Sequence, residues 1–247
     1  MFSPYVSTPF ELFGPGHIAV LVLFILAAAG LLLFRFRLRE STFLKETTRC
    51  TFFTALVLSE VSFQIWAVAA GVWNAREYIP IELCSISTYF ALFILLTKKE
   101  KWFGHFYFLG LLPPMLAMLT PELYYGFPHY MFLRFFLQHM IIPLTVFFFM
   151  FVYQYRPSWR SLFQSILFLN VYAIPIFAVN RLIGANYLFL AGAPEVKTPL
   201  DYLGSGVWYY VHLELIVFGS FALLYAPFLF KDKKIKTKKP GDVEPPV

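Results

Sequence analysis

The chain has 247 residues, of which 59% are hydrophobic, 21% aromatic and only 14% Asp, Glu, Lys or Arg, and its formal net charge is +6. A soluble domain is about 45–50% apolar and about 25% charged, so this chain has too little polar surface for a fold surrounded by water. The composition excludes a soluble globular domain, a disordered chain and a disulfide scaffold, and it indicates an integral membrane protein.

Seven stretches of the sequence are long and apolar enough to be expected as membrane-spanning helices. About 20 mostly apolar residues cross the hydrocarbon core, and lipid offers no partner for an unpaired backbone group, so each span must be helical. In chain order the predicted spans are residues 17–34, 51–73, 80–97, 102–119, 131–153, 161–182 and 207–230. The predicted fold class is therefore all-α, a polytopic membrane protein with a seven-helix bundle.

The basic residues of the connections predict how the bundle is oriented. Sixteen of the 20 Lys and Arg fall after the first, third, fifth and seventh predicted spans, and four fall on the other side. Because Lys and Arg accumulate in cytoplasmic loops, the N-terminus is expected outside and the C-terminus inside. We expect a multi-pass protein of the cell (plasma) membrane.

Two regions are expected, a transmembrane domain over residues 1–230 and a basic tail over residues 231–247. The tail is rich in Lys and then in Pro, so we expect it to be disordered and to lie against anionic lipid of the inner leaflet. Each Lys near such a surface contributes about 1 kcal/mol. No aromatic residues are interleaved with these lysines, so no nucleic-acid partner is expected.

Polar side chains of the predicted spans gather, by depth, in the outer half of the membrane. Such residues are costly in lipid and by default line a cavity or pair with one another. We therefore expect a polar pocket that opens toward the exterior or the outer leaflet. Its expected members are His17, Glu82, Cys84, Ser85, Ser87, Gln138, His139, Asn180, Arg181, Asn186, Tyr187, His212 and Glu214.

Cys84 is the candidate nucleophile of this pocket. A thiol reacts as the thiolate, so it needs a nearby base, and His139 comes from another span at a compatible depth. Glu82 or Glu214 could hold the imidazole in the required tautomer. A structural cysteine packed among helices remains the alternative, because depth alone does not establish contact between helices.

The remaining pocket residues are interpreted as substrate-binding. Ser85 and Ser87 are oxyanion donors or ordinary helix-interface residues. Arg181, with Asn180 and Tyr187, binds an anionic head group or is an arginine that extends to the membrane surface. His17, Gln138, Asn186 and His212 complete this group. The sequence contains no pair of histidines at a spacing typical of zinc sites. We therefore expect neither a metal nor another cofactor.

Seven segments, taken in order, resemble the YwaF-like family of bacterial integral membrane proteins. They are residues 10–17 (FELFGPGH), 80–86 (PIELCSI), 120–123 (TPEL), 126–129 (GFPH), 136–139 (FLQH), 155–159 (YRPSW) and 180–190 (NRLIGANYLFL). That family is distantly similar to a eukaryotic transmembrane acyltransferase of ether-phospholipid remodelling, which uses a Cys and a His without coenzyme A. The resemblance implies that Cys84 accepts the acyl group and that His139 is its base.

Three functions are carried forward from the sequence. The first is a membrane-lipid acyltransferase that moves a fatty acyl group between phospholipids through a thioester on Cys84. The second is a protein that binds or transports a small polar ligand in an extracytoplasmic pocket. The third is a lipid ester hydrolase, because more remotely similar membrane hydrolases use Thr as the nucleophile.

Overall fold

The computed structural model describes residues 1–193 and 199–236, and within these ranges every regular element is helical. The α-helices are α1 (Pro15–Leu33), α2 (Arg35–Glu40), α3 (Thr42–Ala69), α4 (Leu83–Thr97), α5 (Phe103–Leu119), α6 (Tyr130–Phe148), α7 (Trp159–Ile183) and α8 (Val207–Lys236). Short helical turns are η1 (Glu100–Trp102), η2 (Phe149–Tyr153), η3 (Tyr187–Phe189) and η4 (Pro199–Leu203). The all-helical prediction is confirmed for the part of the chain that is described.

Six helical segments are long and apolar enough to cross a membrane, which supports the prediction of a membrane protein. The remaining predicted span, residues 80–97, is the third in chain order and corresponds to α4, which has only 15 residues. A helix of that length is about 22 Å long, less than the ~30 Å of a hydrocarbon core. The number of crossings and the orientation of the termini therefore stay predictions.

The predicted spans and the observed helices differ most at α3, which begins nine residues before the predicted start. Ser41 caps this helix, because its hydroxyl accepts a hydrogen bond from the Leu44 N–H at 3.3 Å. The first turns of α3 are charged but still helical. Hydropathy locates the apolar part of a helix, whereas a capping residue decides where the helix begins.

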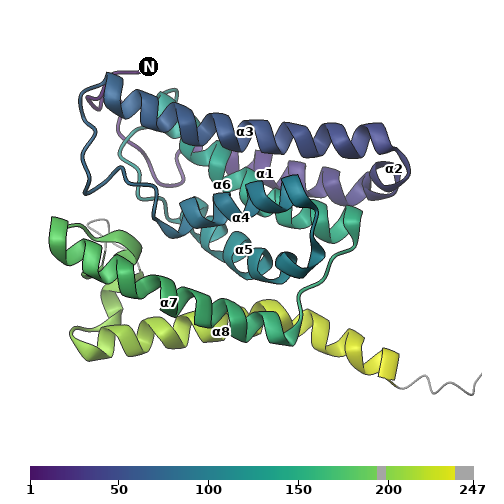
Figure 1. The fold of residues 1–247 in the computed structure, drawn as a ribbon. Coiled ribbons are helices and arrows are strands. Elements are labelled where there is room, and N and C mark those ends of the chain that lie inside the picture. Colours follow the sequence, from purple (N-terminus) through teal and green to yellow (C-terminus); the bar gives the residue numbers. More distant parts are fainter. Residues whose placement is uncertain (194–198, 237–247) are drawn as a thin grey trace, which may run out of the picture.

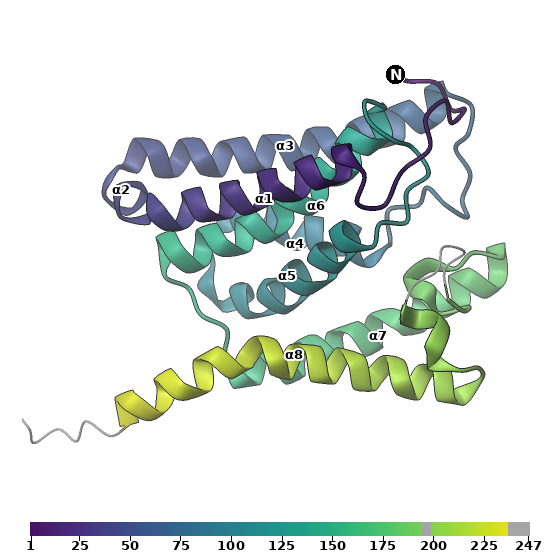
Figure 2. The same ribbon diagram turned by 180° about the vertical axis from the view of Figure 1, so that it is seen from behind.

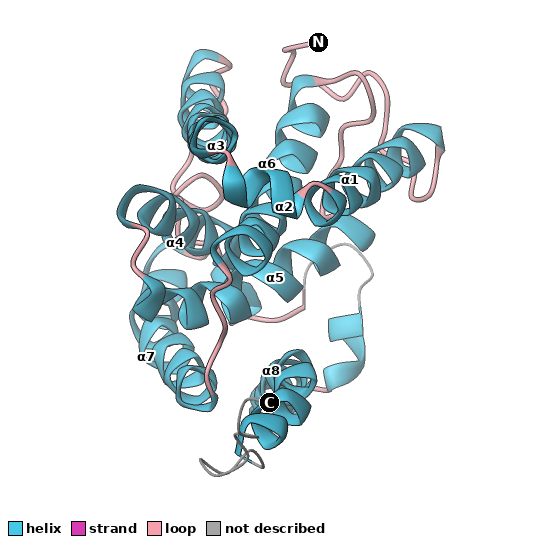
Figure 3. Cartoon of the chain, turned by 90° about the vertical axis from the view of Figure 1, so that its right-hand side faces the viewer, coloured by secondary structure: helices cyan, strands magenta, loops and turns pink. Residues whose placement is uncertain are grey.

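Helix α6 lies at the centre of the bundle and packs against α1, α3, α4 and α5 (Figure 3). In the span formed by α6 and η2, 72% of the most apolar 18 residues are buried inside the protein. The main core is aromatic and includes the fully buried Phe106, Phe108, Phe148 and Phe149. Side chains on α6 therefore meet protein on most sides, and this helix is placed to hold a buried site.

Helices α7 and α8 pair with each other and form a separate layer along α5 (Figures 1 and 2). At the α5–α7 contact, a Cβ at Gly104 would collide with Ser161, so only glycine permits this close approach. The Tyr107 hydroxyl joins α5 to α8 by donating to the Leu224 carbonyl at 3.0 Å. The pair is otherwise largely exposed, as expected for helices that face lipid.

The first fourteen residues cross one end of the bundle and are fastened there by backbone hydrogen bonds. The Phe10 N–H donates to the Tyr124 carbonyl at 2.9 Å, and the Gly126 N–H donates to Thr8 at 2.8 Å. A Cβ at Gly126 would collide with the Pro9 carbonyl, so glycine permits this contact. We call this the N-terminal end; α2 and the last turn of α8 lie at the opposite end, the α2 end (Figure 1).

The predicted boundary at residue 230 does not coincide with the end of a helix, because the backbone of α8 continues to Lys236. Residues 237–247 lie outside the described residues. The predicted tail thus includes six residues at the end of α8 as well as residues outside the description, and the expected disorder and contact with inner-leaflet lipid stay predictions.

Candidate functional site

A buried polar cluster joins α3, α4 and α6 near the N-terminal end. Arg134 and Gln138 are four residues apart and share one face of α6. Arg134 Nη2 lies 3.4 Å from Glu60 Oε2 on α3, and Gln138 Nε2 donates to the same oxygen at 3.0 Å. Gln138 Nε2 also donates to Thr88 Oγ1 on α4 at 2.9 Å. The Arg134 and Glu60 side chains are only 11% and 12% exposed, so this is a largely desolvated ion pair.

Cys84 adjoins this cluster from the first turn of α4. It lies four residues before Thr88, whose hydroxyl donates to the Cys84 carbonyl at 2.9 Å. The thiol is free and half-buried, and in the described part of the chain its sulfur has no hydrogen-bond partner. The same Thr88 hydroxyl accepts from Gln138 Nε2, so the first turns of α4 are joined to the cluster. Cys84 therefore presents an unbonded sulfur at the edge of the buried cluster.

His139 is buried on α6, directly after Gln138 of the cluster. Its Nδ1 bonds the Phe135 carbonyl at 2.7 Å, and its ring stacks on Phe135 with 4.1 Å between centroids. Because a carbonyl only accepts, Nδ1 carries the proton and Nε2 is left with a free lone pair. Among residues 1–193 and 199–236, no hydrogen bond joins this imidazole to Cys84.

The two carboxylates predicted to orient His139 have other partners in the structure. Glu82 directly precedes α4, and its Oε2 accepts a hydrogen bond from the Leu188 N–H at 3.2 Å. Glu214 is exposed on α8 and accepts from Asn170 Nδ2 at 3.3 Å. The carboxylate that is bonded within the cluster is Glu60.

His17 is buried at the start of α1, and both of its ring nitrogens are engaged. Nδ1 accepts from the Phe13 N–H at 2.9 Å, so Nε2 carries the proton that it donates to the Met118 carbonyl at 2.8 Å. His212 is exposed, and its Nδ1 bonds the Leu203 carbonyl at 2.8 Å. These two histidines hold loops in place, and they do not join the cluster around Arg134.

Several predicted substrate-binding residues build the connection between α7 and α8. The Asn180 side chain donates to the Tyr187 carbonyl and accepts from the Tyr187 N–H, each at 2.9 Å. Asn186 bonds Gly192 and Ala191 in the same way. The Tyr187 hydroxyl donates to Ala75, and burial raises the pKa of this phenol, so it remains a donor.

The remaining predicted residues are Ser87, whose side chain is hydrogen-bonded, and Ser85 and Arg181, whose side chains are not. The Ser87 hydroxyl is buried between the carbonyls of Leu83 and Leu109, at 2.8 and 2.7 Å. Arg181 lies over the Phe177 ring at 5.2 Å. Within the described ranges, Ser85 and Arg181 form no side-chain hydrogen bond or ion pair. Of the predicted substrate residues, Gln138 alone is part of the buried cluster.

Two polar atoms of the cluster have no hydrogen-bond partner among the described residues, Ser59 Oγ and Glu60 Oε1. An unsatisfied buried polar atom costs about 1–3 kcal/mol, so such atoms point to a bound water or polar ligand. Ser59, Glu60, Thr88 and Arg134 were not among the predicted site residues. The sequence contains a signal for two of them. Glu60 is an acid in the middle of a predicted span, and Arg134 is four residues from Gln138.

The structure also bears on whether the site could hold a metal ion. In the described residues, no three His, Cys, Asp or Glu side chains lie close enough to hold one. The cluster instead offers a thiol, a guanidinium, an amide and an imidazole, which suit a polar or anionic organic group.

Comparison with known proteins gives one match. A family model described as the TMEM164 family matches residues 12–225, which include α1 to α7 and most of α8. No curated protein and no solved structure matches the chain.

Proposed function

The chain belongs to the TMEM164 family of transmembrane proteins, and we propose that it is a membrane-lipid acyltransferase in which Cys84 carries the acyl group. The observation that carries this proposal is the free, unbonded Cys84 sulfur one turn before Thr88, which the buried cluster holds through Gln138. A thiolate is the reactive form of cysteine, so the proposal also needs a base for the thiol. Residues 80–86 and 136–139 resemble the YwaF-like family, which is distantly similar to Cys- and His-dependent acyltransferases, and this resemblance supports the same assignment.

His139 is the proposed base because its Nε2 lone pair is free and its Nδ1–H is fixed on the Phe135 carbonyl. This arrangement keeps the imidazole in the tautomer that can accept a proton from the thiol. Catalytic hydrogen bonds are often absent before substrate binds and form in the complex. Glu60 takes the supporting role expected of Glu82 or Glu214, because it holds Arg134 and Gln138 in place.

The proposed reaction has two balanced steps. In the first, Cys84 Sγ attacks the ester carbonyl of a phospholipid, a C–S bond forms and the C–O bond breaks. His139 takes the thiol proton and returns it to the departing lysophospholipid. In the second, a hydroxyl of an acceptor lipid attacks the thioester, an ester forms and the thiol is restored. Water as the acceptor would make the same protein a hydrolase.

The same proposal includes the seven crossings, the external N-terminus and a location in the cell membrane, with membrane phospholipids as substrates. Helix α4 packs against α3, α5 and α6, so neighbouring protein covers part of its surface. A short span is tolerated where protein covers it. The proposed reaction then takes place in the outer leaflet, and the proposal keeps the resemblance to the bacterial YwaF-like proteins.

The proposal predicts a thioester on Cys84. Purified protein incubated with a phospholipid that carries a labelled acyl chain should gain one acyl mass, which hydroxylamine removes. Cys84→Ala should abolish the adduct, and His139→Ala should slow its formation by about 10²–10⁴-fold, the usual contribution of a general base.

Cys50 provides a matched control, because it is a second free thiol and is exposed. Cys50→Ala should leave the adduct unchanged. Label that remains in Cys84→Ala, or the absence of any adduct with unchanged lipid profiles in both variants, would refute the proposal.

A second candidate is a membrane protein that binds a small polar ligand, and the unpartnered Ser59 Oγ and Glu60 Oε1 favour it. These atoms could bond a ligand without any part for Cys84. Mass spectrometry of the purified protein separates the two functions. A small molecule retained in Cys84→Ser but lost in Glu60→Gln would support the binding function over acyl transfer.

A further inference from the structure

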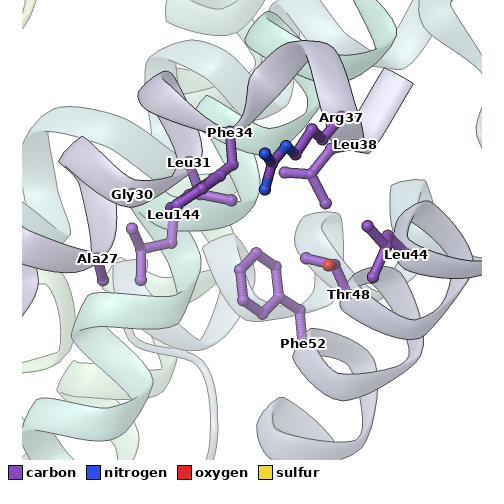
Figure 4. Close-up of a pocket in the computed structure, with 10 residues that line it drawn as sticks. All are labelled: Ala27, Gly30, Leu31, Phe34, Arg37, Leu38, Leu44, Thr48, Phe52 and Leu144. Atoms are coloured by element: carbon purple, nitrogen blue, oxygen red, sulfur yellow. The ribbon is translucent and has the colours of Figure 1, made fainter. Parts of the chain in front are cut away.

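An open groove runs along the surface at the α2 end, away from Cys84 and the buried cluster. It has a volume of about 440 Å³ and is formed by α1, α2 and α3, with Leu144 of α6 at its base (Figure 4). We call it the α2 groove; the lining residues used below are Gly30, Leu31, Arg37, Thr48, Phe52 and Leu144. Its volume lies in the range of about 300–1,000 Å³ that is usual for small-molecule sites.

The groove exists because α2 crosses between α1 and α3 and holds their ends apart (Figure 3). Gly30 makes the groove deeper, because the space that a side chain would occupy at this position is empty. No atom lies within 4 Å of a Cβ built there. Leu31, Phe52 and Leu144 supply apolar walls. A lining of this kind suits a hydrocarbon chain, because contact between two apolar groups removes the surface of both from water, which is favourable.

Arg37 distinguishes this groove from an ordinary lipid-facing surface. Its guanidinium is directed over the groove (Figure 4), and in the described part of the chain it forms no hydrogen bond or ion pair. The neighbouring arginines of α2 are engaged: Arg35 donates to the Leu32 carbonyl at 2.6 Å, and Arg39 donates to Phe151 at 2.8 Å. The Arg37 guanidinium lies over the Phe34 ring at 5.8 Å, a contact that leaves its N–H donors available for an anion at the mouth of an apolar groove.

The acidic residues near this end do not neutralise Arg37. Glu46 pairs with Arg49 at 2.6 Å and with Lys98 at 2.9 Å. Glu40 ends α2 and forms no ion pair with Arg37 in the structure. Arg37 and Thr48 are the two lining residues of the groove that have polar side-chain groups.

We propose that the α2 groove binds one anionic phospholipid, with its phosphate on Arg37 and Thr48 and one acyl chain along Gly30, Leu31 and Phe52. Charge complementarity selects this occupant, because a guanidinium binds phosphate by two parallel hydrogen bonds and the walls below it are apolar. A neutral lipid would leave Arg37 without a counter-charge. The site is independent of the proposed acyl transfer, since no residue of α4 lines it.

The charge contact is tested by native mass spectrometry of the detergent-purified full chain, titrated with phosphatidylglycerol or phosphatidylcholine of the same acyl chains. The wild type should retain one phosphatidylglycerol, and Arg37→Gln should weaken this retention about tenfold, the effect of losing one charge-assisted hydrogen bond. Arg35→Gln is the matched control and should bind normally, because Arg35 is held by the Leu32 carbonyl. Equal retention of both lipids, or an equal effect of both variants, would overturn the proposal.

The apolar wall is tested by filling it. Gly30→Leu places a side chain in the groove without a clash and should abolish retention of the lipid. Gly219→Leu is the matched control, since Gly219 on α8 also has nothing within 4 Å of its Cβ position. Retention in Gly30→Leu would refute the site, as would displacement of the lipid by inorganic phosphate alone or a mass that shows a second copy of the chain instead of a lipid.

Discussion

At the scale of single residues, the strongest chemical feature is an ion pair that is almost removed from solvent. Glu60 accepts from Arg134 and Gln138 through one oxygen, while its other oxygen is unpartnered in the described structure. The Arg134 guanidinium also lies over the Phe63 ring at 4.0 Å. Breaking such a pair leaves an uncompensated charge, whereas replacing both partners by apolar groups does not.

This difference makes a stability prediction. Glu60→Leu or Arg134→Met alone should lower the free energy of unfolding by about 3–5 kcal/mol, and the double variant should lose much less. Thermal or denaturant unfolding in detergent measures all three. Additive losses in the double variant would show that the two side chains do not form a coupled pair.

At the scale of elements, the contact between α5 and α7 depends on the missing side chain of Gly104. The Ser161 that fills this space also closes a capping box with Ser158 at the start of α7. The Ser165 hydroxyl, one turn further along α7, lies 3.3 Å from His105 Nδ1 on α5, so this part of α7 is also bonded to α5. Glycine at residue 104 thus sets how closely the α7–α8 pair approaches the bundle.

Gly104→Ala should therefore destabilise the protein by about 1–3 kcal/mol, the usual cost of overpacking a buried contact. Gly30→Ala is the comparison, because its new Cβ meets no atom within 4 Å. A fall in melting temperature for Gly104→Ala but not for Gly30→Ala is the expected result. Similar melting temperatures for both variants would mean that α7 can shift away from α5.

At the scale of the whole molecule, the N-terminal end and the α2 end carry different groups. Residues 1–14, the buried cluster and the first turn of α4 belong to the N-terminal end, and the arginines of α2 lie at the other. The excess of Lys and Arg predicts that the α2 end is cytoplasmic. The two proposed sites, at Cys84 and at the α2 groove, would then serve opposite leaflets.

Thiol labelling tests this orientation. In a Cys84→Ser background, a membrane-impermeant maleimide should label Tyr5→Cys in intact cells, because Tyr5 is 81% exposed at the N-terminal end. Cys50 should react only after the membrane is permeabilised. The reverse pattern would invert the topology, and it would place the Cys84 site in the inner leaflet.

The sequence by itself determined that this is a helical membrane protein, where its apolar helices lie, and that polar groups occur at depth within them. These are local properties, since about 20 apolar residues form a helix in lipid whatever lies beside them. The depth of Cys84, His139 and Gln138 was predictable for the same reason.

Only the tertiary structure decided which polar groups meet. His17, Asn180 and Tyr187 were predicted at suitable depths, yet each bonds the backbone of a connecting segment, whereas Glu60 and Arg134 form the buried cluster. Contact depends on how each helix is rotated and which helices are neighbours. Those are set by packing around α6, including close contacts such as Gly104 with Ser161, which hydropathy along the chain does not encode.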